Sequence, residues 1–335
     1  MKIAILSPIA WQTPPKHYGP WEQVASNVAE GLVDLGMEVT LFATGDSLTK
    51  GKLDSVIPVG YEEDRELDAK VVECLHISNV MEKAADFDII HNHFDFLPLT
   101  YAKLINTPMV TTIHGFSSPK IVPVYQKYND HTSYTSISNS DRHPDLNYLA
   151  TVYNGIKTSD FTFQAKAEDY LLFLGRIHPH KGTAAAIEIA KRTKRKLIIA
   201  GIIQDQAYFK EKVEPFLDED IQFIGPADAK KRNELLGKSL GLLHPILFDE
   251  PFGLVVAEAM MCGTPVIAFN RGAMPELIST GETGFLVDTV DEAVERVYQL
   301  HNINRNRCRK HAVANFSKEK MAESYLQCYQ QILKH

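Results

Sequence analysis

Short apolar segments alternate with amphipathic segments along most of this chain. Continuous apolar runs of a few residues, bounded by turn-forming residues, are typical of strands buried on both faces of a parallel sheet. Helices are expected between such strands, so the pattern predicts an α/β protein. The predicted strands are Ile3–Leu6, Val39–Ala43, Ile89–Ile90, Val110–Ile113, Ser136–Ile137, Tyr170–Gly175, Lys196–Ala200, Gln222–Ile224, Gly241–His244 and Pro265–Ala268.

The segment after the first strand has helical periodicity. Within Trp21–Leu35, apolar residues recur at the spacing of a helix with one buried face. Gly36 then stands where a glycine commonly ends a helix. A helix is therefore predicted over residues 21–35.

The alternation starts again near residue 160, which indicates two domains. Residues 151–155 end the first series and residues 170–175 open the second, so the boundary is expected within 155–168. A chain of 335 residues is also longer than one hydrophobic core usually fills. The expected parts are Rossmann-like domains at 1–160 and 161–316, and a helix at 317–335 that packs back on the first domain.

Composition and charge narrow the class of protein. The net charge is −7, with 44% hydrophobic and 23% charged residues, which is typical of a globular protein. A nucleic-acid binder would need a broad basic face, so this net charge argues against nucleic-acid binding. The basic run Lys191–Lys196 is either a solvated helix end or a patch that touches anionic lipid or a charged acceptor. Peripheral membrane contact therefore stays open.

Targeting and cysteine signals predict a cytoplasmic protein. The apolar run at the N-terminus stops at Ser7, too early for a signal peptide. No apolar run is long enough to span a bilayer. The four cysteines form no close-spaced metal pair, so free thiols in a reducing compartment are expected.

A pair of glutamates brackets the start of a predicted helix in the second half. Pro251 cannot lie inside a helix, so the helix is predicted over residues 253–262, with Gly263 as its cap. Glu250 then lies in the loop before the helix, and Glu258 lies on the helix itself.

The residues around this helix start can bind hydroxyls and anions. The N–H groups of Phe252, Gly253 and Leu254 are expected to be exposed at the helix terminus. Carboxylates such as Glu250 and Glu258 accept hydrogen bonds from vicinal diols of a ribose or a hexose. The alternative is an ordinary capping carboxylate at Glu250 and a surface residue at Glu258.

A basic loop, Gly175–Gly182, follows a predicted strand and precedes a helix. Ligands of parallel sheets bind at the carboxyl ends of the strands, so its position suits a site. Arg176 and Lys181 supply positive charge that can hold a diphosphate without a metal. A solvated surface loop is the alternative.

Together, these clusters resemble the retaining glycosyltransferases of family 4, which include glycogen-synthase-like and sucrose-synthase-like enzymes. The likeness rests on the E-x₇-E element from Glu250 to Glu258 and on the segments Ala259–Ala268, Gly272–Ile278 and Thr283–Val287. It extends over essentially the whole chain and is specific over residues 170–290.

The resemblance implies the GT-B fold, two Rossmann-like domains that face each other across a cleft. It implies a hexosyltransferase that uses a nucleotide-diphosphate sugar, retains the anomeric configuration and needs no metal or other cofactor. The N-terminal domain would bind the acceptor, and the C-terminal domain would bind the nucleotide sugar. UDP-glucose is the expected donor, while GDP- and ADP-sugars stay open, as do sugar, lipid and small-molecule acceptors.

The same resemblance assigns the donor's diphosphate and nucleoside to particular residues. Arg176 and Lys181 would hold the diphosphate and stabilise the departing nucleotide. Glu258 would bind the ribose hydroxyls. Ile224 follows the predicted strand whose end contacts the base through backbone groups in this family.

The transferred sugar would be held from both domains. Glu250 and the backbone of Phe252, Gly253 and Leu254 would bind its hydroxyls. His114 ends a predicted buried strand of the first domain, and the resemblance implies a histidine beside the sugar there. A neutral imidazole can hydrogen-bond a sugar hydroxyl, although a structural role is the alternative.

The loop after the first strand departs from the family pattern. Related enzymes carry two adjacent glycines followed closely by an acidic residue, and this loop approaches the donor phosphate. Here Gly19 is followed by Pro20 and then by Glu22. Gly19 still permits close backbone approach, but Pro20 removes one N–H donor. A tight turn that starts a helix is the alternative reading of Gly19.

Weaker candidates lie elsewhere in the first half. His91 and His93 lack a third ligand at suitable spacing, so a polar pair lining the cleft is favoured over a metal site. The Asp86–Asp88 pair precedes its strand, the wrong end for a ligand of a parallel sheet. Residues 138–142 follow another strand and are candidates for the acceptor side.

Three other functions are alternatives to glycosyl transfer. A nucleotide-sugar epimerase or hydrolase of the same architecture would use the same donor site without an acceptor. A nicotinamide-dependent dehydrogenase needs G-x-G-x-x-G after the first strand, which residues 8–12 lack. A non-catalytic sugar-binding protein would lack the basic and acidic clusters, which are present here.

Overall fold

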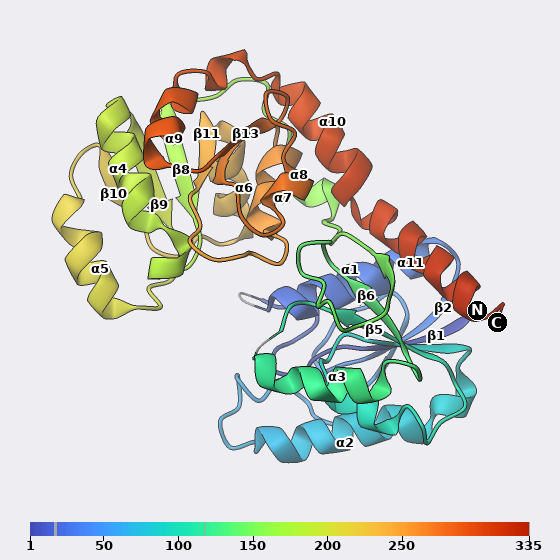
Figure 1. Ribbon diagram of the computed structural model, residues 1–335. Helices are drawn as coiled ribbons and strands as arrows, with labels where there is room; N and C mark the ends of the chain where they lie inside the picture. The colour runs from blue at the N-terminus through green and yellow to red at the C-terminus, as the bar shows by residue number, and fades with distance from the viewer. Residues whose placement is uncertain (17–18, 117, 335) are drawn as a thin grey trace. The chain divides into compact units, whose positions relative to one another are not determined.

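The computed structural model describes residues 1–16, 19–116 and 118–334, in two compact units (Figure 1). The N-terminal unit comprises Met1–Gly155 and the C-terminal segment from Lys318, and the C-terminal unit comprises Ile156–Ser317. The chain thus changes unit a few residues from the expected limits at 160 and 316.

The N-terminal unit is built on one parallel sheet with the strand order β3-β2-β1-β4-β5-β6-β7. The order runs outward in both directions from β1, so the sheet has a switch point between β1 and β4, where ligands of such sheets bind. The strands are β1 Lys2–Leu6, β2 Glu38–Phe42, β3 Lys52–Asp54, β4 Ile89–Asn92, β5 Met109–Ile113, β6 Ser133–Ser136 and β7 Tyr148–Thr151.

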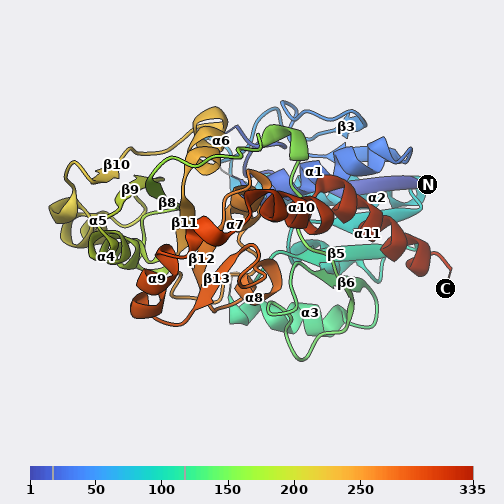
Figure 2. The ribbon, with the colours of Figure 1, turned by 90° about the horizontal axis from the view of Figure 1, so that it is seen from above.

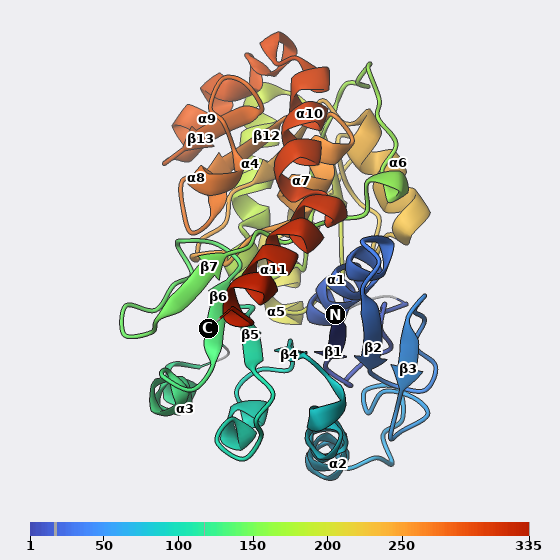
Figure 3. The same ribbon diagram turned by 90° about the vertical axis from the view of Figure 1, so that its right-hand side faces the viewer.

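Helices cover both faces of this sheet, as Figure 3 shows. Alternate residues of β1 point to opposite faces, with Ile3 and Ile5 in the core under α1 and α11, and Ala4 and Leu6 in the core under α2 and α3. The helices are α1 Pro20–Asp34, α2 Ala69–Glu82, α3 Val122–Tyr128 and α11 Lys318–Ile332.

The C-terminal unit repeats this plan with the order β10-β9-β8-β11-β12-β13, again all parallel. Its switch point lies between β8 and β11. The strands are β8 Tyr170–Leu174, β9 Lys196–Ala200, β10 Ile221–Phe223, β11 Gly241–His244, β12 Val266–Phe269 and β13 Gly284–Val287.

In the C-terminal unit, α4 packs beside α9, and α7 packs beside α10 (Figures 1 and 2). The predicted α/β class with two Rossmann-like units is therefore confirmed. The helices are α4 Thr183–Thr193, α5 Gln206–Lys212, α6 Ala229–Lys238, α7 Leu254–Met261, α8 Met274–Leu277, α9 Val290–Val297 and α10 Arg305–Phe316.

The predicted strands recur with small shifts, and the sequence pattern missed β3, β7 and β13. The strand β3 is three residues long and β7 is four residues long, and no residue of either strand is buried. The strand β6 begins at Ser133, earlier than predicted. Its start was missed because a polar residue, Thr135, is buried within the strand and interrupts the apolar pattern. The hydroxyl oxygens of Thr135 and Thr112 lie 3.0 Å apart.

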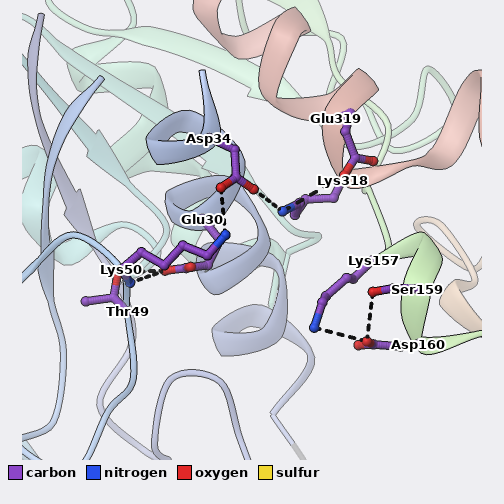
Figure 4. A network of polar contacts seen from close by, with 9 residues as sticks. All are labelled: Glu30, Asp34, Thr49, Lys50, Lys157, Ser159, Asp160, Lys318 and Glu319. Carbon is purple, nitrogen blue, oxygen red and sulfur yellow. Dashed lines mark hydrogen bonds and ion pairs between the residues drawn. The ribbon is translucent and has the colours of Figure 1, made fainter. Parts of the chain in front are cut away.

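The C-terminal helix α11 belongs to the N-terminal unit and packs on α1. Its first residue is anchored by charge, because the Nζ atom of Lys318 lies 2.6 Å from a carboxylate oxygen of Asp34 (Figure 4). Lys50 holds the other oxygen at 2.6 Å. Within the part of the chain that the structure describes, no helix is long and apolar enough to cross a membrane.

The contact between α1 and α11 predicts a stability effect at Gly31. A Cβ atom added there would lie 2.6 Å from the Cβ of Ala322, so Gly31→Ala is expected to lower the free energy of unfolding by about 1–3 kcal/mol. This would occur although alanine favours the helix by about 1 kcal/mol. The second change Ala322→Gly should restore much of the loss in a thermal or urea unfolding cycle. An increase in stability from Gly31→Ala alone would contradict the contact.

Candidate functional site

Two loops meet at the switch point of the C-terminal unit, one after β8 and one after β11. The backbone N–H of Leu247 donates to the carbonyl of His180 at 2.7 Å. Gly182 has a φ of +76°, and a Cβ there would lie 1.9 Å from the carbonyl oxygen of Pro245. The close approach of the two loops therefore requires glycine at this position.

Lys181 and Glu250, which lie on these two loops, form an ion pair. Their side chains are only 15% and 16% exposed, so the pair is largely removed from solvent. The Nζ atom of Lys181 also lies 4.7 Å from the ring centroid of Phe248, a cation–π contact. The fold thus brings together two of the predicted site residues.

His244, the last residue of β11, faces the same pair. Its Nε2 atom lies 3.9 Å from a carboxylate oxygen of Glu250 and has no hydrogen-bond partner among the described residues. Burial lowers the pKa of His244 to about 4, so the imidazole is neutral near pH 7. The sequence pattern marked His244 only as the end of a strand, although the end of a strand at a switch point is itself a signal of a ligand site.

A third loop, after β12, fixes the backbone of Glu250. The N–H of Ala273 donates to the carbonyl of Glu250 at 2.9 Å. A Cβ at Gly272, where φ is +53°, would lie 2.4 Å from the backbone nitrogen of Glu250. This glycine belongs to the segment on which the family resemblance rests, and its role here is to let the two loops touch.

Arg176 lies on the β8 loop, and its guanidinium donates to the side-chain oxygen of Gln204, beyond β9, at 2.8 Å. The loop packs closely against the end of β9: a Cβ at Gly201 would lie 1.8 Å from the carbonyl oxygen of Gly175. The predicted phosphate-binding charges therefore sit on one loop, with Lys181 held by Glu250 and Arg176 held by Gln204.

The predicted helix start is close to the observed one, at Leu254 of α7. Gly253 precedes it with φ +91°, and a Cβ there would meet the methyl group of Met274 at 2.7 Å. Phe252 is buried, with its ring 5.8 Å from that of Phe316 in an edge-on contact. Residues 252–254 thus form the entry to α7, next to the loop of Glu250.

Glu258 is buried on α7 rather than exposed, so the surface reading of this residue is wrong. Its carboxylate lies 3.7 Å from the guanidinium of Arg232 on α6. Burial raises the pKa of Glu258, and Arg232 opposes that rise. The Nε of Arg232 is buried without a hydrogen-bond partner in the described chain, so this N–H group could still donate a hydrogen bond.

Ile224 directly follows β10, as predicted. Its N–H donates to the carbonyl of Ile199 at 3.0 Å, and its side chain is exposed. The backbone there continues the parallel ladder for one residue beyond the strand. Ile224 therefore stands at the carboxyl edge of the sheet, on the β10 side of β9.

In the N-terminal unit, His114 follows β5 and is half-buried. Its Nε2 lies 3.0 Å from Nδ1 of His93, and its ring stacks on Trp21 with 5.5 Å between centroids. Desolvation lowers the pKa of His114 to about 3. The imidazole is therefore neutral and is fixed on two sides.

The expectation that His91 and His93 line the cleft is wrong, because both side chains are fully buried. His91 lies 2.6 Å from the hydroxyl of Tyr329 on α11 and 2.7 Å from that of Thr112. Because Nε2 of His93 lies 3.3 Å from Nδ1 of His91, the two histidines connect His114 to the C-terminal helix. Across residues 1–16, 19–116 and 118–334, no group of three His, Cys, Asp or Glu side chains could hold a metal ion.

Gly19 is the residue before α1, with φ +155°. A Cβ there would lie 2.8 Å from the carboxylate of Glu22. Pro20 occupies the first turn of α1, where a backbone N–H has no helical partner. Residues 17 and 18 of this predicted loop lie outside the described residues.

The candidate acceptor segment 138–142 follows β6, as predicted. The Nε of Arg142 donates to the hydroxyl of Ser136 at 3.1 Å. Its guanidinium lies 5.1 Å from the ring centroid of Tyr148. This arginine is therefore used within the sheet edge formed by β6 and β7.

Known sequences match both units. A family model described as Glycosyl transferases group 1 matches residues 157–315, and one described as Glycosyltransferase Family 4 matches residues 21–158. An uncharacterised glycosyltransferase of Methanocaldococcus jannaschii is 23% identical, over 95% of this chain and 96% of that protein.

Solved glycosyltransferase structures share the fold of this chain. The HepE protein of Anabaena, solved with UDP and glucose, has a TM-score of 0.74 at 18% identity and covers 99% of this chain and 100% of that one. The sucrose-phosphate synthase of Thermosynechococcus elongatus has a TM-score of 0.80 at 17% identity, covering 100% and 99%. The expected resemblance is confirmed: this chain is an enzyme that belongs to the family 4 glycosyltransferases and has the GT-B fold.

Proposed function

We propose that this enzyme transfers a hexosyl unit from a nucleotide-diphosphate sugar, UDP-glucose, to an acceptor hydroxyl in the cytoplasm, with retention of configuration and without a metal. The C-terminal unit binds the donor and the N-terminal unit binds the acceptor. The observation that carries the proposal is the poorly exposed Lys181–Glu250 pair at the switch point of the C-terminal sheet.

The charges of the β8 loop support metal-free binding of a diphosphate. Lys181 and Arg176 supply two fixed positive charges, and charge-assisted hydrogen bonds to phosphate are strong. Without a ligand, Lys181 is held by Glu250. On donor binding, the diphosphate competes for Lys181, and the carboxylate of Glu250 becomes available to sugar hydroxyls.

The remaining residues of the C-terminal unit suit the rest of the donor. Glu258 accepts hydrogen bonds from the ribose hydroxyls, while the backbone at 252–254 contacts the sugar and that at Ile224 contacts the base. In the N-terminal unit, the neutral imidazole of His114 hydrogen-bonds a sugar hydroxyl, and Gly19 lets the backbone approach the donor.

The chemistry follows from leaving-group stabilisation. The acceptor oxygen bonds to the anomeric carbon as the bond from that carbon to the diphosphate oxygen breaks. The hydroxyl proton passes to the departing diphosphate. Lys181 and Arg176 stabilise the negative charge that develops there, which is where an enzyme gains most from fixed charges.

The base of the donor is tested by thermal shift. UDP, GDP, ADP and their sugar conjugates are each added to the folded protein, with and without a chelator. A ligand at about 100 times its Kd stabilises by about 2.7 kcal/mol, and we expect UDP and UDP-glucose to raise the Tm by about 5–10 °C. The chelator should leave the shift unchanged.

Each part of the proposal has its own contrary outcome. A shift by GDP or ADP compounds alone would overturn the choice of UDP. Loss of the shift in chelator would overturn metal independence. No shift from any nucleotide, in protein shown to be folded, would overturn the donor site. Release of free nucleotide without a glycoside would favour the hydrolase alternative.

A further inference from the structure

A cavity of about 560 Å³ is lined by described residues that all belong to the N-terminal unit. Its walls include the loop after β1 and the loop after β4, so it opens at the switch point of that sheet, where ligands of parallel sheets bind. The volume is within the usual range for a site that encloses a small molecule.

Carboxylates form the polar part of the cavity. Glu22 is only 4% exposed, and burial raises its pKa to about 7. Glu73 accepts a hydrogen bond from the hydroxyl of Tyr61 at 3.0 Å, and Asp95 accepts one from Tyr125 at 2.5 Å. None of the described residues that line the cavity is a lysine, an arginine or a histidine.

Aromatic rings form much of the remaining wall. Trp11, Trp21, Tyr61, Phe94 and Phe96 all line the cavity. Flat apolar rings pack against the C–H faces of a sugar or cyclitol, while carboxylates accept hydrogen bonds from the hydroxyl or amino groups at its edge. The lining therefore matches a ring that is apolar on its faces and rich in hydrogen-bond donors at its rim.

The cavity adjoins a predicted catalytic residue of the same unit. Trp21, one of the residues that line the cavity, stacks on His114. A ring bound in the cavity would therefore lie near the imidazole that is expected beside the transferred sugar. This proximity favours the acceptor as the occupant.

We propose that this cavity is the acceptor subsite and that it takes a donor-rich ring without an anionic group, either a neutral or an amino sugar or cyclitol. The inference rests on the proposed function and adds the acceptor's class. A phosphate or carboxylate on the acceptor would meet the carboxyl groups of Glu22, Glu73 and Asp95, and none of the described lining residues is a cation that could pair with it. Juxtaposed like charges of this kind are an effective means of excluding a ligand.

The chain's only two tryptophans, Trp11 and Trp21, both line the cavity, so intrinsic fluorescence reports on it directly. The full-length protein is titrated with glucose, myo-inositol, glucosamine and glucose 6-phosphate up to roughly tens of millimolar, a range that covers weak binding. At least one of the first three should change the emission with saturation. Glucose 6-phosphate should bind at least about tenfold more weakly than the tightest of them, about 1.4 kcal/mol.

Variants separate the subsite from a general effect on folding. Glu73→Gln should weaken glucosamine more than glucose and should narrow the gap between glucose and glucose 6-phosphate. Glu30→Gln is the matched control, because Glu30 also accepts a hydroxyl hydrogen bond, from Thr49 at 2.7 Å, but lies outside the cavity lining. It should leave all four titrations unchanged.

The comparison of glucose with glucosamine tests how the carboxylates of the cavity act. Tighter binding of glucosamine than of glucose is expected, because the carboxylates act as anions in this proposal. Equal binding of the two would contradict the exclusion of anionic acceptors by like charge. Tighter binding of glucose 6-phosphate, or no emission change from any ligand in folded protein, would overturn the inference. The titration needs no nucleotide, so its failure beside a normal UDP-induced shift would leave the proposed function standing.

Discussion

Replacing Lys181 by alanine is expected to lower kcat by about 10²–10³-fold, the usual loss when one group that stabilises a developing charge is removed. Lys181 is the charge closest to Glu250 at the switch point. The measurement is nucleotide release from the sugar nucleotide identified by thermal shift, in the presence of acceptor. Turnover near that of the unchanged enzyme would remove Lys181 from the mechanism.

Lys83→Ala is the matched control for this experiment. Lys83 also pairs with a poorly exposed carboxylate, that of Asp54 at 2.6 Å, and its Nζ lies 5.8 Å from the ring centroid of Phe42. It therefore loses the same kinds of contact as Lys181, but outside the predicted site, and should keep its turnover.

Loss of Lys181 also leaves Glu250 largely buried without its cation, which can lower stability by about 3–5 kcal/mol. The double variant Lys181→Ala with Glu250→Gln removes that unpaired charge. It should regain melting temperature and remain inactive. Recovery of turnover together with stability would show that Lys181 acts only through folding.

Gly182→Ala is expected to destabilise the C-terminal unit more than Gly225→Ala does. Both glycines have nearly the same φ, +76° and +74°, so both substitutions carry the strain of a left-handed alanine, about 1–2 kcal/mol. Only Gly182 adds a collision, with the carbonyl oxygen of Pro245 at 1.9 Å, while nothing lies within 4 Å at Gly225.

The collision adds about 1–3 kcal/mol to the loss at Gly182. In a unit of this size, each kcal/mol lowers the Tm by about 2–4 °C. Gly182→Ala should therefore melt roughly 2–12 °C below Gly225→Ala in matched thermal scans. Equal melting temperatures would mean that the β8 and β11 loops do not meet as described.

Local sequence patterns predicted most strands of the two sheets and the start of one helix at the candidate site. Apolar runs long enough to fill a buried strand marked β1, β8 and β11, and Pro251 with Gly263 bracketed α7. The edge strands β3 and β7 escaped detection, since both are short and no residue of either is buried.

The chemical partners of the site residues could not be read from the sequence. Lys181 and Glu250 are 69 positions apart, and His91 and Tyr329 are 238 apart. Glu258 could be a surface residue by its helical position alone, yet α6 covers it with Arg232. His244 carried no signal beyond its place at a strand end.

The sequence by itself determined the α/β class, the two-part organisation, the family and the residue types at the proposed donor site, because these depend on local periodicity and on short motifs. Only the tertiary structure decided which charges pair, which histidines are buried and neutral, and that Glu22, Glu73 and Asp95 share one aromatic cavity. The physical reason is that strand order and the close approach of glycine backbones place distant segments together. Burial and pKa then follow from that placement.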